Sequence, residues 1–98
     1  MASAIRSVVA ELDFEAILER LDRSSPEKAR EFAALVNARC AVIAAQPKIG
    51  RPRDELSPGL RSFVIDRCVF FYRITDDGIT ISRIIHGAQD ADAIMQDE

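Results

Sequence analysis

Residues 60–86, which read LRSFVIDRCVFFYRITDDGITISRIIH, decide the fold of this chain. Three runs in this stretch are rich in β-branched and aromatic residues and have the length of a strand. They span residues 60–65, 68–75 and 79–86. Residues 66–67 separate the first two runs, and residues 76–78 separate the last two, with Gly78 available for the positive φ of a tight turn. The stretch therefore predicts an antiparallel three-stranded meander.

Two amphipathic helices precede the meander. Apolar residues recur at three- and four-residue intervals from position 8 to position 22, with Ser7 placed as the N-cap. Ser25 followed by Pro26 predicts a second helix start, and a second apolar stripe continues to about Ala45, before Pro47. The short link indicates an antiparallel helical hairpin. It should cover one face of the meander, because three strands alone are only marginally stable.

Weaker signals stand at the two ends of the chain. Ile5 and Arg6 leave room for a very short strand, and residues 91–95 read as a short C-terminal helix with Asp90 as its cap. The expected fold class is therefore α+β, an N-terminal helical hairpin packed on an antiparallel β-meander. Residues 1–98 fit a single domain, because a chain of this length with 48% hydrophobic residues builds one core.

The charge balance and the apolar runs narrow the function classes. The net charge is −3, whereas nucleic-acid binders usually carry a basic excess, so direct sequence-specific nucleic-acid binding is not expected. Lys48, Arg51 and Arg53 still form a local basic cluster that can steer an acidic partner. No apolar run reaches the roughly 18 residues of a membrane span, and the N-terminus lacks a secretory signal pattern. We therefore expect a cytoplasmic protein with no membrane partner.

The two cysteines, Cys40 and Cys68, stand in neither a zinc-ligand spacing nor a CxxC arrangement. Reduced thiols packed in the core are the simpler interpretation. We expect no metal and no other cofactor.

Four short strings carry a resemblance to a known family. They are GRPRDEL at residues 50–56, GLR at 59–61, FYR at 71–73 and RIIHG at 83–87. With the order helix, helix, meander and short helix, they resemble the ParE branch of the RelE/ParE toxin superfamily over nearly the whole chain. In the first helix, Ala10, Asp13, Phe14 and Ile17 fall where that family tends to have Ala, Asp, an aliphatic residue and Ile.

This resemblance implies a bacterial type II toxin that a cognate ParD-like antitoxin neutralises in a hetero-oligomer. The ParE branch is associated with poisoning DNA gyrase, whereas RelE-like relatives on the same scaffold cleave messenger RNA on the ribosome, and fold alone does not choose. Two positions depart from the family pattern: Gln89 stands where the family often has Arg, and residues 66–68 replace a Gly-Arg-Tyr-like turn. They leave a third alternative open, a degenerate toxin that only binds antitoxin.

The enzymatic alternative needs clustered cations together with a general acid and a general base. Arg67 and Arg73 are the candidates for phosphate, and His86 is the candidate acid, although a lone histidine at a strand end more often makes a structural hydrogen bond. Arg67 begins the second strand and His86 ends the third, so the two could lie close together. No convincing base accompanies them, because Asp66 is a turn residue and Tyr72 reads as packing. The main hypothesis therefore assigns no catalytic residue, and the alternative is a ribosome-dependent endoribonuclease using His86 and Arg67.

Partner binding is assigned to basic side chains of the second half of the chain. The candidates are Arg51, Arg53, Arg61, Arg67, Arg73, Arg83 and His86. Arg51 and Arg53 lie in a proline-bounded connection whose rigidity lowers the entropy lost on binding. Together with Arg61 they offer guanidinium groups to the carboxylates of an acidic antitoxin tail or target surface.

Arg83 has a structural interpretation as well. Strand alternation places it on the same face as Ile79, Ile81 and Ile85. If that face packs on the helices, a carboxylate such as Asp13 or Glu31 should pair with Arg83, because an unpaired buried charge is very costly.

The aromatic residues Phe63, Phe70, Phe71 and Tyr72 suggest either a core or a base-stacking platform. Phe70 and Phe71 are adjacent and point to opposite faces, so at most one of them joins the helix-facing core. We expect an antitoxin strand or helix to cover the other, since a bare apolar face invites aggregation.

Overall fold

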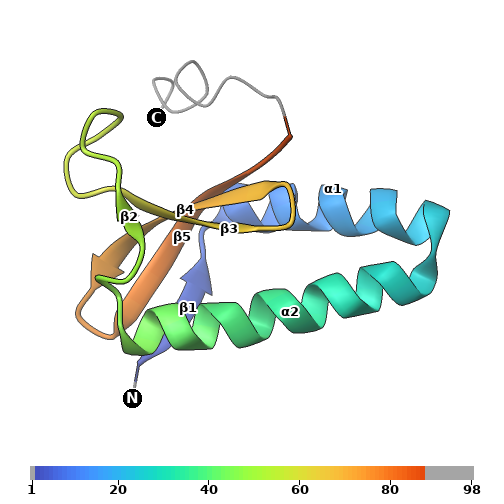
Figure 1. Ribbon diagram of the computed structural model, residues 1–98, viewed down its shortest axis with the longest axis horizontal. Helices are drawn as coiled ribbons and strands as arrows, with labels where there is room; N and C mark the ends of the chain where they lie inside the picture. Colours follow the sequence, from blue (N-terminus) through green and yellow to red (C-terminus); the bar gives the residue numbers. More distant parts are fainter. Residues whose placement is uncertain (1, 88–98) are drawn as a thin grey trace.

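Residues 2–87 of the computed structural model form two layers, a helical hairpin and a five-stranded mixed sheet (Figure 1). The elements in chain order are β1 (Ser3–Arg6), α1 (Val8–Ser24), α2 (Pro26–Ala45), β2 (Arg51–Pro52), β3 (Arg61–Ile65), β4 (Cys68–Thr75) and β5 (Gly78–His86). The strands lie in the order β1-β5-β4-β3-β2, with β1 parallel to β5 and all other neighbours antiparallel. The expected α+β class, the hairpin and the meander are confirmed. Neither α1 nor α2 is long and apolar enough to cross a membrane.

The ends of the sheet add to the expected meander. The very short strand that the sequence allowed at Ile5 and Arg6 is present as β1. The sequence did not predict β2. Because Pro52 has no amide hydrogen, the two residues of β2 do not read as a strand in the sequence. The helix expected at residues 91–95, its cap Asp90 and the family departure at Gln89 lie outside the described residues.

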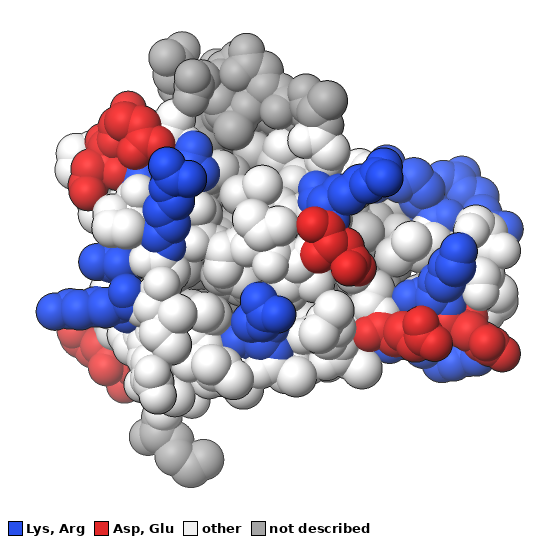
Figure 2. Space-filling view, in the orientation of Figure 1, with Lys and Arg blue, Asp and Glu red and all other residues white. Residues whose placement is uncertain are grey.

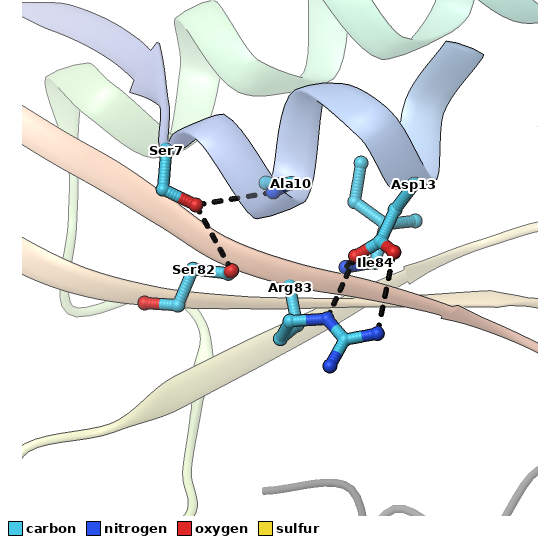
Figure 3. Close-up of polar contacts among 6 residues, drawn as sticks. All are labelled: Ser7, Ala10, Asp13, Ser82, Arg83 and Ile84. Atoms are coloured by element: carbon cyan, nitrogen blue, oxygen red, sulfur yellow. Dashed lines mark hydrogen bonds and ion pairs between the residues drawn. The ribbon is translucent and has the colours of Figure 1, made fainter. Parts of the chain in front are cut away.

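Two serines set the helix ends as the sequence predicts. The Ser7 hydroxyl accepts a hydrogen bond from the Ala10 amide at 3.1 Å and donates one to the Ser82 carbonyl at 3.1 Å, which ties the start of α1 to β5 (Figure 3). Ser25 alone separates the helices. Its amide donates to the Leu21 carbonyl at the end of α1, and its hydroxyl accepts from the Lys28 amide at the start of α2. The hairpin therefore reverses through a single residue.

The main core lies between the helices and one face of the sheet. Phe14 of α1 and Val36 of α2 pack there with Tyr72 of β4. Cys40 and Cys68 lie in the same core as free thiols, which confirms the expected packing, and burial raises the pKa of both.

A β-bulge changes which residues of β5 face the helices. Phe71 pairs with Arg83, but the next residue, Tyr72, pairs with Ile81, so Ser82 is an extra residue without a partner on β4. One extra residue reverses the alternation of side chains along the rest of the strand.

The bulge corrects the predicted position of Arg83. Ile79, Ile81 and Ile84 belong to the helix-facing core, whereas Ile85 belongs to the cluster on the opposite face. Arg83 therefore does not share a face with Ile79 and Ile81, because strict alternation cannot anticipate a bulge.

The opposite face of the sheet carries its own small apolar cluster. Leu60, Phe71 and Ile85 are buried there, with Leu56 and Val69 packed against them. Phe70 joins the helix-facing core instead, so the expected division of the two phenylalanines is confirmed. The expectation that a partner covers the other one is wrong for Phe71, whose side chain the chain itself buries completely.

Candidate partner-binding surfaces

Asp13 of α1 holds the edge of β5 that β1 leaves uncovered (Figure 3). Asp13 Oδ2 accepts a hydrogen bond from Arg83 Nε at 2.8 Å and another from the Ile84 amide at 3.0 Å, and Oδ1 accepts from Arg83 Nη2 at 3.2 Å. Both side chains of the ion pair are largely buried. The predicted pairing of Arg83 with Asp13 is confirmed, and it fixes α1 against the sheet.

Arg61 and Tyr72 fix the connection that follows α2. Arg61 Nη1 donates to the carbonyl oxygens of Gly50 at 2.7 Å and Lys48 at 3.1 Å. The Tyr72 hydroxyl donates to the Pro47 carbonyl at 2.6 Å and accepts from the Gly50 amide at 3.1 Å. Burial of the ring raises the pKa of Tyr72. The segment is therefore rigid and presents its exposed side chains in a set position.

Arg53 holds the loop between β2 and β3 over the outer apolar cluster. Its Nε donates to Glu55 at 2.8 Å and its Nη1 donates to the Ser62 hydroxyl at 3.3 Å. The guanidinium also lies over the Phe71 ring, 5.4 Å from the ring centroid. The hydrogen bond from Arg53 lowers the pKa of the exposed Glu55 carboxyl.

Arg73 holds the same loop from β4. Its Nη1 donates to the Pro58 carbonyl at 2.8 Å, and its Nη2 donates to the Ser57 hydroxyl at 2.7 Å. Arg73 is therefore separated from Arg67, with which the sequence paired it for phosphate binding. Their positions are six residue steps apart along the strand, about 20 Å at ~3.3 Å per residue.

Most of the predicted partner-binding arginines thus form hydrogen bonds within the protein itself. Arg53, Arg61, Arg73 and Arg83 bind carbonyl, hydroxyl or carboxylate oxygens of the chain itself. These acceptors lie in loops, on β3 or on α1, where sequence spacing gives no signal. Partner binding by the seven candidates stays a prediction. Arg51 and Arg67 are the two of them whose side chains are exposed and make no hydrogen bond inside residues 2–87.

His86 and Arg67 meet at one end of the sheet, as the sequence predicted. The Gly87 amide donates to the Arg67 carbonyl at 2.9 Å, and His86 pairs with Cys68. Both side chains line a cavity of about 390 Å³. Its remaining lining residues are Ile17, Arg20, Leu21, Phe32, Asp66 and Cys68.

The chemistry of this cavity suits an anion. Arg20 and Arg67 contribute two positive charges to its lining and Asp66 one negative charge, beside the apolar side chains of the other lining residues. Asp66 occupies the turn with a positive φ of 54° and is exposed. Arg20 was not among the predicted site residues, because it comes from α1 and no motif links it to the meander.

The fold matches two solved toxin–antitoxin structures. A chain of a chromosomal ParDE system from P. aeruginosa aligns with a TM-score of 0.72 at 24% identity, covering 89% of this chain and 97% of that one. A chain of the RelBE2 toxin–antitoxin complex from Mycobacterium tuberculosis aligns with a TM-score of 0.60 at 22% identity, covering 87% and 96%. The chain therefore shares its fold with these two chains.

Sequence comparison shows to which toxin family the chain is similar. The family model described as the ParE toxin of type II toxin-antitoxin systems matches residues 5–91. The ParE1 toxin of Mycobacterium tuberculosis is 33% identical over 72 residues, which cover 72% of this chain and 74% of that toxin. The ParE3 toxin of Caulobacter vibrioides is 38% identical over 45 residues, or 46% and 45% of the two chains. The chain belongs to the ParE toxin family of type II toxin–antitoxin systems.

Proposed function

We propose that this ParE-family toxin acts in the cytoplasm by binding DNA gyrase, without catalysis of its own, and that a cognate ParD-like antitoxin neutralises it. Family membership supports the toxin role. The observation that supports action by binding is the internal anchoring of Arg53, Arg61 and Arg73. These bonds make the two loops flanking β2 rigid, so their exposed groups lose little entropy when they meet a partner.

A supercoiling assay with purified gyrase tests the proposal. Increasing toxin should reduce the supercoiling of relaxed plasmid, and addition of the cognate antitoxin should restore it. The Arg51→Glu variant should inhibit less, because the Arg51 side chain is exposed on β2 and makes no hydrogen bond within residues 2–87. Normal supercoiling at saturating toxin would contradict the proposal, and growth arrest on expression without antitoxin separates an active toxin from a degenerate one.

A second candidate function follows from the cavity at His86. Arg67, Asp66 and His86 line the same space, and a volume of about 390 Å³ accommodates a nucleotide-sized group. If the protein is a ribosome-dependent endoribonuclease, messenger RNA should be cleaved in a translation reaction, and His86→Ala should abolish the cleavage. Intact message with the wild-type protein would rule this candidate out.

A further inference from the structure

β1 forms one edge of the sheet, at the opposite end of the strand order from β2 (Figure 1). β5 pairs with one side of β1, and within residues 2–87 no strand lies on its other side. The open side of an edge strand carries peptide groups that can pair with a further strand. β1 is therefore a place where the sheet can be extended.

Both ends of β1 are fixed to β5 and the turn before it. The Ser3 amide donates a hydrogen bond to the Asp77 carbonyl at 2.7 Å. At the other end, the Ser7 amide donates to the Ile81 carbonyl at 2.9 Å. Gly78 allows β5 to approach closely, because a Cβ at this position would overlap the backbone of Ser3. The open edge is thus held in place, which lowers the entropy lost when a strand binds to it.

The peptide groups of Ala4 and Arg6 point out of the sheet. Alternate residues of a strand direct their backbone groups to opposite sides. Because the Ser3 and Ser7 amides bond to the β5 side, Ile5 between them faces β5 as well. Ala4 and Arg6 therefore turn their amide and carbonyl groups to the open side.

The Ile5 side chain stands at this edge on the face of the sheet away from the helices. Its neighbour Ala4 pairs with Ile79, which belongs to the helix-facing core, whereas Ile5 pairs with Thr80. Ile5 is 59% exposed. A strand added beside β1 would cover this apolar side chain.

The one charged side chain of β1 is neutralised by the chain itself. The Arg6 guanidinium pairs with Glu11 and lies over the Phe14 ring. Asn37 and Ala41 of α2 flank the edge, where they line a cavity of about 210 Å³ together with residues of β1. Figure 2 shows mostly uncharged surface along the C-terminal half of α2. The unpaired charges that commonly keep edge strands from pairing are therefore missing from β1 itself.

These features fit a second copy of the same chain. In an antiparallel pair of two β1 strands, Ala4 of each copy faces Arg6 of the other, and these residues exchange both backbone hydrogen bonds. Ile5 then faces Ile5 of the second copy in a non-hydrogen-bonded pair, where side chains come closest, with Cα atoms about 4.5 Å apart. One register thus satisfies the outward peptide groups and buries both isoleucines.

We propose that two copies of this protein associate through β1 about a two-fold axis at Ile5, which joins their sheets into one. The contact is small, because β1 has 4 residues, so the dimer is weak and depends on concentration. β2 lies at the far end of each sheet, so the pairing leaves both β2 edges free, at opposite ends of the joined sheet. The inference does not rest on the proposed function.

Sedimentation velocity of the untagged full-length protein over roughly 5–500 µM tests the dimer. The mass of the wild type should rise with concentration toward twice that of the monomer. Ile5→Lys should weaken association by roughly tenfold or more, because like charges then face each other. The matched control is Leu12→Lys, the same change at an equally exposed side chain on α1, and it should stay within about twofold. Circular dichroism and thermal melting confirm that each variant is folded.

A mixture of two variants tests the register. Ile5→Lys and Ile5→Glu should each be mainly monomeric, but an equimolar mixture should associate, because opposite charges then meet across the two-fold axis. A wild type that stays monomeric, or a dimer that folded Ile5→Lys leaves intact, would overturn the proposal. Dissociation by Leu12→Lys alone would place the contact on α1 and overturn it as well. A mixture that stays monomeric would overturn the pairing of Ile5 with Ile5.

Discussion

The Tyr72 hydroxyl accepts a hydrogen bond from the Gly50 amide at 3.1 Å, and this contact determines where β2 can begin. It also explains why residue 50 is glycine, because a Cβ there would overlap the hydroxyl oxygen. A core tyrosine thus sets the position of a surface loop through one buried polar atom.

Removal of that atom should loosen the loop without removing the ring. Tyr72→Phe should lower the free energy of unfolding by about 1–3 kcal/mol, because the Pro47 carbonyl and the Gly50 amide both lose a partner. Gly50→Ala should cost at least as much, since the added methyl group has no space. Chemical denaturation measures both changes, and wild-type stability of Gly50→Ala would contradict this account.

The Asp13–Arg83 pair should contribute far more than the less buried pair that Glu11 of the same helix makes with Arg6. Asp13→Ala should cost about 3–5 kcal/mol, because it breaks a largely buried ion pair and removes the carboxylate that accepts from the Ile84 amide. Glu11→Ala, which removes the more exposed partner of Arg6, should cost less than about 1 kcal/mol. Denaturant titration of both variants would contradict this account if the two costs were equal.

The outer apolar cluster should be part of the stable fold rather than a surface awaiting a partner. Phe71→Ala should cost about 3–5 kcal/mol, as expected for a fully buried aromatic ring. Val64→Ala, on the exposed edge of β3, should change stability by less than about 0.5 kcal/mol. A small loss for Phe71→Ala in the free toxin would show that the loop from residue 53 to residue 60 does not cover the ring.

The two core thiols should make stability depend on alkaline pH. Burial raises the pKa of Cys40 and Cys68, so the folded state holds these protons more tightly than the unfolded state. Their contribution is fully present below the unfolded pKa of about 8.5 and is lost as the pH rises through the folded pKa.

The wild type should therefore lose stability more steeply than the Cys40→Ala/Cys68→Ala variant between about pH 8 and pH 10. Titration of Tyr72 affects both proteins alike. Equal slopes in denaturant titrations across this range would contradict the assignment.

The sequence predicted the elements of the fold well because their signals are local. Ser7 and Ser25 act at the helix ends where the sequence places them, and Gly78 takes a positive φ of 142° at the turn. The carboxylate partner of Arg83 could also be anticipated, since the cost of an unpaired charge limits the choices.

Other features could not be predicted, because they depend on contacts between distant segments. The bulge at Ser82 depends on how β4 and β5 pair. The acceptors of Arg61 and Arg73 are loop oxygens that become neighbours only after folding. A count of exposed-looking arginines therefore overstated the cationic surface left for a partner.

A titration of DNA gyrase supercoiling activity with purified toxin tests the central claim, action by binding, most directly. We predict that inhibition rises with toxin until the two proteins are near equal concentration and then reaches a plateau. Full supercoiling at a large excess of toxin, together with messenger RNA cleavage that disappears in His86→Ala, would contradict the claim and assign the toxicity to catalysis.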